Sequence, residues 1–242
     1  MRGLFVTATD TGVGKTAVAC SLVTAMRRRG LDVGAMKPAE SGCPRDAAGR
    51  LVPADARLLQ AAAGGGDPLE LVCPYRLEAP LAPGIAAARE GVAIDPAEVE
   101  RCLRALGDRH ADGVVVEGAG GLLVPLDPAF TTMADLAARL SLPVIVVARA
   151  SLGTINHTAL TLEALAARRI PVKGVILSAG RLEDEGAAAE NAKAIERLTG
   201  APVLASLPFA KGGSDAERID FLSAWLDERM AGRKLDPASL LA

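Results

Sequence analysis

The sequence is poor in aromatic residues, which make up 2% of its 242 residues although 50% are hydrophobic. Its core must therefore be built from Val, Leu, Ile and Ala. Cysteines are also few. Cys20, Cys43, Cys73 and Cys102 show no CxxC spacing, and a chain of this length does not need disulfides for its stability. We expect free thiols in a reducing compartment, and leave open a reactive thiol at Cys43, which lies in a Gly- and Pro-rich loop.

The sequence also lacks an excess of positive charge, because its formal net charge is -2. A general nucleic-acid binder would be strongly basic, so no nucleic-acid partner is expected. No apolar run approaches the length of a membrane span, and the apolar stretch near the N-terminus is too short for a signal peptide. We therefore expect a cytoplasmic protein without a membrane partner.

Apolar runs typical of buried strands alternate with Ala-rich helical patterns along the chain. Strands are predicted to begin near Leu4, Asp32, Gly113, Pro143, Val172 and Pro202, and helices are predicted over residues 15–29, 54–63, 96–109, 132–139, 155–168, 187–199 and 216–230. This order favours an α/β fold with a doubly wound, mainly parallel sheet flanked by helices. We expect one domain over residues 1–242, in which residues 231–242 form a loosely held tail.

The segment TDTGVGKT, residues 9–16, follows the first predicted strand and opens the first predicted helix. Its glycines allow backbone amides to converge on phosphate oxygens, Lys15 reaches the outer phosphates, and the Thr16 hydroxyl is a ligand for Mg²⁺. The GxxxxGK[ST] pattern is incomplete, because Thr9 stands at its first glycine. The strand and helix around the segment nevertheless favour a phosphate loop over a plain strand–helix connection.

Further polar residues lie at the ends of predicted strands and helices, which meet at one crevice in a doubly wound sheet. Lys37 ends the second strand, either as a second cation for phosphates or as a lysine that extends to solvent. Glu117 follows three valines and precedes glycines, which favours a direct or water-mediated Mg²⁺ ligand over a solvent-facing acid. Asp55 opens a helix, where a carboxylate is common for stability alone. Ser41 is suited to bind a small ligand or to form an ordinary turn.

The segment ASLGTINHT, residues 150–158, follows the fourth predicted strand. Gly153 and Thr154 precede a helix, so their amides are suited to hold a carboxylate, and Asn156 is placed to contact a ligand. A lone histidine at a helix start is more often structural. We therefore assign no role to His157, and none to His110.

Together, the segments TDTGVGKT, KPAESG, EAPLAPGIAA, VEGAGGLLVPL and SLGTINHT, in this order and with these gaps, resemble the dethiobiotin synthetase family. The similarity covers residues 4–208. It implies a homodimeric cyclo-ligase of the P-loop class. With Mg²⁺ and ATP, or another nucleoside triphosphate, such an enzyme joins CO₂ to 7,8-diaminononanoate and closes the ring of dethiobiotin. The implied route passes through a carbamate and a carbamic–phosphoric anhydride, without a protein nucleophile.

The resemblance also implies roles for individual residues. Catalysis would involve Lys37, Lys15 and Thr11, and the substrate would contact Ser41, Thr11, Gly153 and Asn156. Mg²⁺ would be held by Thr16, Asp55 and Glu117. The nucleotide would contact Gly12, Val13, Gly14, Lys15, Thr16, Ala17, Asp55, Glu117, Gly118, Ala119, Gly120, Ser178, Ala179 and Pro208.

The chain departs from the family pattern at several positions. Ser178 and Ala179 stand where an Asn-Asp pair commonly contacts the base, which puts the base selectivity in question. Gly84 stands in place of a common histidine. Asn191 replaces a tyrosine that some members extend across the dimer to the substrate, and Ala8 replaces a frequent glycine.

Other interpretations compete with this one. A partition-type ATPase, a switch that binds partners, predicts a lysine at the position of Asp10 and a basic or amphipathic membrane segment, and the sequence has neither. A glutamine-dependent cobyrinate-type amidase needs a nucleophilic cysteine domain, for which 242 residues leave no room. A non-enzymatic nucleotide-binding module would not need Lys37, Asp55 and Glu117 together.

Overall fold

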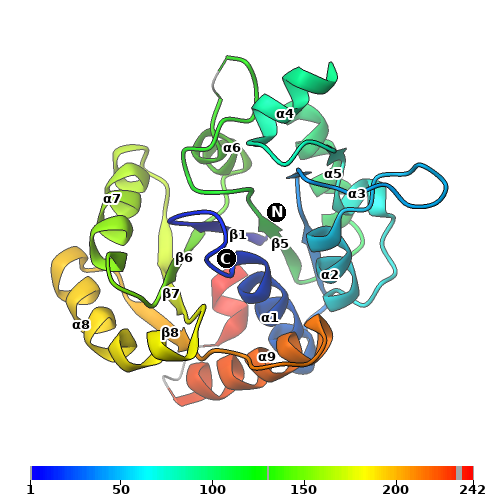
Figure 1. Ribbon diagram of the computed structural model, residues 1–242. Coiled ribbons are helices and arrows are strands. Elements are labelled where there is room, and N and C mark those ends of the chain that lie inside the picture. Colours follow the sequence, from blue (N-terminus) through cyan, green and yellow to red (C-terminus); the bar gives the residue numbers. More distant parts are fainter. Residues whose placement is uncertain (1, 130, 233–235, 242) are drawn as a thin grey trace.

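The computed structural model describes residues 2–129, 131–232 and 236–241, which form a six-stranded sheet whose neighbouring strands are all parallel. The strand order is β2-β5-β1-β6-β7-β8, so the first strand lies inside the sheet (Figure 1). The strands are β1 (Gly3–Ala8), β2 (Val33–Met36), β5 (Gly113–Glu117), β6 (Val144–Arg149), β7 (Val172–Ser178) and β8 (Val203–Leu207). The doubly wound, mainly parallel sheet predicted from the sequence is confirmed.

Helices cover both faces of this sheet (Figure 1). One face carries α1 (Lys15–Arg28), α2 (Ala54–Ala62) and α9 (Asp215–Gly232), of which α1 and α9 pack against each other. The other face carries α5 (Pro96–Gly107), α6 (Met133–Leu140), α7 (Thr154–Ala167) and α8 (Ala188–Thr199). Each helix predicted from the sequence corresponds to one of these. In the described part of the chain, no helix combines the length and the apolar character needed to cross a membrane.

The strands are apolar on both sides because both sides are covered. Val114 and Val116 of β5 belong to the hydrophobic cluster beneath α5 and α6, whereas Val115 belongs to the cluster beneath α1 and α9. Consecutive side chains of a strand point to opposite faces, so a sheet that is covered twice requires a continuous apolar run. Glu117 ends this run, and its side chain is also buried.

Several short elements carry no periodic signal and are absent from the sequence-based prediction. They are β3 (Ala39–Glu40), β4 (Tyr75–Arg76), α3 (Leu69–Val72), α4 (Pro83–Glu90) and the 3₁₀ helix η1 (Leu182–Ala187). β3 and β4 pair in parallel and, with α4, enclose a small apolar cluster of their own. The Gly84 amide at the start of α4 donates to Pro125 O at 2.9 Å. A Cβ at Gly84 would lie 2.7 Å from the Asp127 nitrogen, so a side chain does not fit there without movement of this backbone.

The expectation of a loosely held tail over residues 231–242 is wrong for the described part of that segment. Its first residues complete α9, and η2 (Pro237–Leu241) is a 3₁₀ helix that packs against α1, β1 and β5. Leu240 and Leu241 are buried in the cluster formed with α1 and α9. The hydrophobic effect drives this packing, because the transfer of two adjacent leucine side chains out of water is favourable. The contact lies at the edge of the sheet remote from the phosphate loop. Residues 233–235 and 242 lie outside the described residues.

Candidate active site

The predicted phosphate loop leaves β1 at the carboxyl edge of the sheet and runs into the N-terminus of α1. Gly12 and Gly14 have φ angles of 73° and 92°, a region that residues with a side chain rarely adopt. A Cβ at Gly14 would also lie 2.6 Å from the Ser178 hydroxyl oxygen. The turn therefore requires glycine at these positions, and it leads into a helix N-terminus, where free amides and the helix dipole favour anions.

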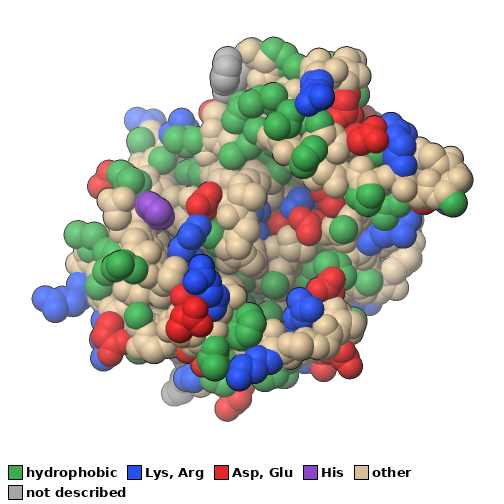
Figure 2. Space-filling view, viewed as in Figure 1, with side chains coloured by type: hydrophobic (Ala, Val, Ile, Leu, Met, Phe, Trp, Pro, Cys, Tyr) green, Lys and Arg blue, Asp and Glu red, His purple; other side chains and the backbone are tan. Residues whose placement is uncertain are grey.

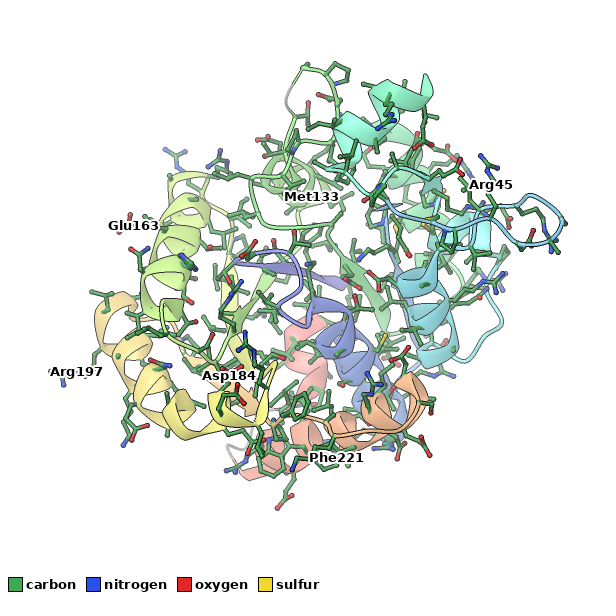
Figure 3. All side chains as sticks on the ribbon, in the orientation of Figure 1. Arg45, Met133, Glu163, Asp184, Arg197 and Phe221 are labelled. Atoms are coloured by element: carbon green, nitrogen blue, oxygen red, sulfur yellow. The ribbon has the colours of Figure 1, made fainter. Side chains whose placement is uncertain are left out.

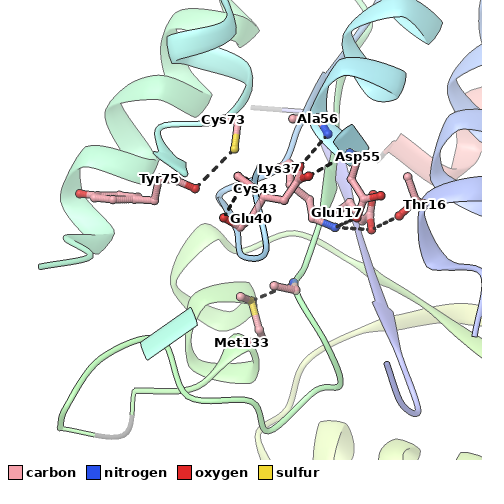
Figure 4. Close-up of polar contacts among 11 residues, drawn as sticks. Thr16, Lys37, Glu40, Cys43, Asp55, Ala56, Cys73, Tyr75, Glu117 and Met133 are labelled. Carbon is pink, nitrogen blue, oxygen red and sulfur yellow. Dashed lines mark hydrogen bonds and ion pairs between the residues drawn. The ribbon is translucent and has the colours of Figure 1, made fainter. Parts of the chain in front are cut away.

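Lys37, Asp55, Glu117 and Thr16 meet beside this loop (Figure 4). Lys37 Nζ lies 2.6 Å from Glu117 Oε1 and 3.0 Å from Asp55 Oδ2. The Thr16 hydroxyl donates to the same Glu117 oxygen at 2.9 Å. Glu117 is fully buried and Lys37 is 4% exposed. Lys37 is thus held by two carboxylates and does not extend to solvent.

Burial and charge act against each other in this cluster. Burial alone would lower the pKa of Lys37, but the charges of Glu117 and Asp55 outweigh it and hold that pKa above its usual value. Burial would raise the pKa of Asp55, but the charge and hydrogen bond of Lys37 keep it below its usual value. The pKa of Lys15 is lowered by burial and by the neighbouring Lys37. Among the described residues no hydrogen bond or ion pair holds the Lys15 ammonium, so this cation is available for an anionic ligand.

The cluster lines a hollow in the middle of the face shown in Figure 2. A cavity of about 420 Å³ there is lined by the phosphate loop and by Lys37, Ala39, Glu40, Ser41, Asp55, Glu117, Ala119 and Gly120. A second cavity of about 390 Å³ adjoins it at Gly12, Gly14, Thr16 and Asp55. Its other lining residues include Val13, Ala17, Leu58, Ser178, Ala179, Pro208, Phe209 and Ile219. The phosphate loop thus separates a charged cavity from a more apolar one.

Most of the predicted site residues line these two cavities, and three do not. Gly118 packs against the Phe5 ring, where a Cβ would lie 3.0 Å from the nearest ring carbon. Gly153 precedes α7 with a φ of 94°, and Asn156 lies in the first turn of that helix. Both are exposed and lie outside the two cavities.

The chain is similar to known proteins along most of its length. A protein-family model described as an AAA domain matches residues 2–216. A curated protein from Anaeromyxobacter dehalogenans (strain 2CP-C), named ATP-dependent dethiobiotin synthetase BioD, is 57% identical over 86% of this chain and 91% of its own length. Proteins of the same name from Anaeromyxobacter sp. (strain Fw109-5) and Bacillus cereus (strain B4264) are 48% and 40% identical, over 96% and 90% of this chain and 99% and 88% of theirs. The chain belongs to the dethiobiotin synthetase family.

Solved structures of other proteins share the fold of this dethiobiotin synthetase family member. The MinC:MinD cell division protein complex of Aquifex aeolicus matches with a TM-score of 0.59 and 14% identity, over 97% of this chain and 96% of that one. A ParA family ATPase from Chlorobium tepidum TLS matches with a TM-score of 0.53 and 14% identity, over 99% and 96%. Identities this low show the fold alone. Asp10, where partition-type ATPases carry the second lysine, forms an ion pair with Arg149 at 2.7 Å.

The positions that depart from the dethiobiotin synthetase pattern have defined surroundings. Ser178 and Ala179 line the second cavity, at the end of β7. Asn191 of α8 donates through Nδ2 to Ala150 O at 2.8 Å, which connects α8 to the loop before α7. At Gly84, backbone atoms occupy the space that a histidine side chain would need.

The sequence analysis missed Glu40, which lies between Lys37 and Ser41. Its buried carboxylate lines the charged cavity and accepts hydrogen bonds from the amides of Asp55 and Ala56. The signal in the sequence is a charged residue among the small residues of KPAESG, at the end of a strand.

The reactive thiol left open at Cys43 finds no support in the structure. All four cysteines are free and buried. Burial raises the pKa of the Cys43 thiol to about 11, which keeps it protonated and unreactive near neutral pH.

Proposed function

We propose that the protein is an ATP-dependent dethiobiotin synthetase, which converts 7,8-diaminononanoate, CO₂ and ATP to dethiobiotin, ADP and phosphate. The observation that carries this proposal is the buried Lys37, held between Asp55 and Glu117 beside a phosphate loop. The chain is also 57% identical to a protein of that name. A phosphate loop alone would fit many nucleotide-binding proteins, whereas a second buried lysine suits a reaction in which two anions must meet.

The first chemical steps bring these two anions together. One amine of the substrate adds to CO₂ and loses a proton, which gives a carbamate. A carbamate oxygen then attacks the γ-phosphorus of ATP, and ADP leaves. Two like unit charges 4 Å apart repel each other by about 4 kcal/mol at an effective dielectric constant of 20. Lys37 and Lys15 would oppose this repulsion and stabilise the charge on the transferred phosphoryl group.

In the last step the second amine attacks the carbonyl carbon of the carbamic–phosphoric anhydride, expels phosphate and closes the ring. None of these steps needs a covalent bond to the protein. We assign Thr11 and Ser41, which line the charged cavity, to substrate binding next to Lys37. Gly153 and Asn156 would contact the substrate carboxylate at the N-terminus of α7.

The residues beside the phosphate loop suit a Mg²⁺ ion. Glu117 Oε2 is buried and has no hydrogen-bond partner among the described residues, so a carboxylate oxygen is free there. We assign the ion to Thr16, Asp55 and Glu117, since Mg²⁺ prefers oxygen ligands and commonly shares them with nucleotide phosphates. When bound, the ion would neutralise charge on the phosphates. In the described part of the chain no three His, Cys, Asp or Glu side chains form a metal site by themselves, which suits an ion that binds with a nucleotide.

The more apolar cavity would hold the base of the nucleotide. With the phosphates on the loop, the nucleotide would extend past Gly12, Val13 and Ala17 to Ser178, Ala179 and Pro208. ATP is the proposed co-substrate. Residues 178 and 179 offer no side-chain amide to a base, so other nucleoside triphosphates remain candidates.

We further propose that the protein is a homodimer and acts in the cytoplasm. Leu152 is 98% exposed, and Leu160 is exposed two turns along α7. Asn156 and Leu160 lie four residues apart on one face of α7, and Leu152 precedes the helix. Exposed leucines on both sides of Asn156 in the sequence suit contact with a second copy, and such a contact would place Asn156 near the interface.

The proposed activity can be tested with purified protein, 7,8-diaminononanoate, bicarbonate, Mg²⁺ and ATP, with dethiobiotin detected by mass. We expect product with the wild-type protein and none with Lys37→Ala. Failure to form product with ATP, CTP or GTP, together with slow hydrolysis of these nucleotides, would favour a switch-type ATPase instead.

A further inference from the structure

Glu40 of β3 lies three residues after Lys37 and hydrogen-bonds to the first turn of the helix that carries Asp55 (Figure 4). It is 7% exposed, and both of its carboxylate oxygens are used. Oε1 accepts the Asp55 amide at 3.0 Å, and Oε2 accepts the Ala56 amide at 2.9 Å. The segment between them projects from the molecule, and its Arg45 side chain points outward (Figure 3). The two hydrogen bonds therefore join the ends of a projecting loop at the edge of the charged cavity.

These hydrogen bonds give the N-terminus of α2 the side-chain acceptor that the residue before the helix does not provide. The first amides of a helix have no partner within the helix, and the residue before the helix commonly supplies a side-chain acceptor. In α2 that residue is Pro53, which makes no side-chain hydrogen bond of this kind in the described structure. Glu40 takes its place from another element, and its negative charge is favoured at a helix N-terminus.

The same contact fixes the position of Asp55. Its amide is held by Glu40 at 3.0 Å, and its carboxylate is held by Lys37 Nζ at 3.0 Å. The Thr16 hydroxyl also interacts with this carboxylate, and 41% of the Asp55 side chain is exposed. Its direction toward Lys37 and Glu117 therefore depends on where the first turn of α2 lies.

We propose that Glu40 is a positioning residue, which holds the first turn of α2 so that the Asp55 carboxylate faces the divalent-ion site. This inference rests on the proposed function, because it takes Asp55 as a ligand of the ion that accompanies the nucleotide. Groups that orient a metal ligand typically affect metal affinity by about 10- to 100-fold. Glu40 would orient Asp55 through its backbone amide.

Calorimetric titration with ADP, in Mg²⁺ and in EDTA, measures this effect without turnover. The wild-type protein is expected to bind ADP more tightly in Mg²⁺. Glu40→Gln keeps the shape but offers one acceptor oxygen and presents an amide nitrogen to the second backbone amide. We expect it to reduce the Mg²⁺-dependent gain in affinity about tenfold or more, with little change in EDTA. Glu40→Asp, a second variant in case the first fails to fold, keeps the charge on a shorter side chain and should lose part of the gain.

The matched control is Asp95→Ala, at a helix start away from the cavity. Asp95 precedes α5, and its carboxylate accepts the Ala97 amide at 2.8 Å. This variant removes a comparable helix cap and should leave the Mg²⁺-dependent gain unchanged. Amide hydrogen exchange gives a local readout, since Asp55 and Ala56 should lose protection in Glu40→Gln.

The titrations and the activity assay distinguish a failure of the positioning role from a failure of the proposed function. An unchanged Mg²⁺-dependent gain in Glu40→Gln and Glu40→Asp overturns the positioning role. So does a raised KM for the diamine at an unchanged gain, because Glu40 would then contact the substrate itself. An absent gain in the wild-type protein also overturns it. If wild-type protein binds ADP with the expected gain but forms no dethiobiotin, the proposed function fails and the positioning role stands.

Discussion

Lys37→Met is expected to show that charge holds the buried cluster together. The substitution keeps an unbranched side chain and removes its charge, so Glu117 is left buried with the Thr16 hydroxyl as its partner. Removal of one member of a buried ion pair typically costs about 3–5 kcal/mol. We therefore expect Lys37→Met to lower the free energy of unfolding by about 3–5 kcal/mol at pH 7.

Urea unfolding in EDTA at pH 7, followed by circular dichroism, measures this loss of stability. Lys173→Met is the control, because Lys173 donates to the Ser239 carbonyl oxygen at 2.9 Å and faces no buried carboxylate there. Lys173→Met should lower the free energy of unfolding much less than Lys37→Met does. The double variant Lys37→Met/Glu117→Gln should recover much of the loss, since no buried carboxylate remains to be compensated. A loss no larger than that of Lys173→Met, or a double variant no more stable than Lys37→Met, would refute the reasoning.

Three further predictions concern stability. Gly84→Ala places a Cβ 2.7 Å from a backbone nitrogen and should lower the free energy of unfolding in the same urea titration by about 1–3 kcal/mol. Its control is Gly186→Ala, which should have little effect because no atom of the described structure lies within 4 Å of the added Cβ. Leu241→Ala should lower it by about 2–5 kcal/mol because Leu241 is fully buried, and the exposed Leu198→Ala should leave the melting temperature nearly unchanged. The pKa of Asp55 is lowered from 3.8, so its ionised form stabilises the fold above that pH and the contribution is lost on acidification. In EDTA, Asp55→Asn should therefore lose less stability than the wild-type protein as the pH falls below 4.

The sequence was sufficient to predict the main sheet and the phosphate loop because both have local signals. A continuous run such as GVVVE indicates a strand buried on both faces, and glycines before Lys15 indicate a turn into a helix. The sequence left two interpretations for Asp55, a helix-start carboxylate or a site residue. In the structure Asp55 lies in the first turn of α2 and also pairs with Lys37, so the two interpretations do not exclude each other.

Features that depend on distant segments could not be predicted in this way. β3 has two residues, too few for any periodicity, and pairs with a strand more than thirty residues later. The role of Glu40 depends on that placement, because its partners on α2 follow a long loop. Leu240 and Leu241 form too short an apolar pair to indicate a helix, and their burial depends on a space left between α1, β1 and β5.

The position of β1 in the sheet has a consequence for synthesis of the protein. β1 pairs with β5 and β6, through Leu4 with Val115 and Phe5 with Val144, more than a hundred residues later in the chain. At translation rates of about 5–20 residues per second, this strand, which is fully buried in the folded protein, waits roughly 7–28 s for both partners. Pairings this distant also fold slowly once they are available. The nascent chain therefore exposes an aggregation-prone strand for many seconds, and the yield of folded protein in a cell is expected to depend on chaperones that cover it.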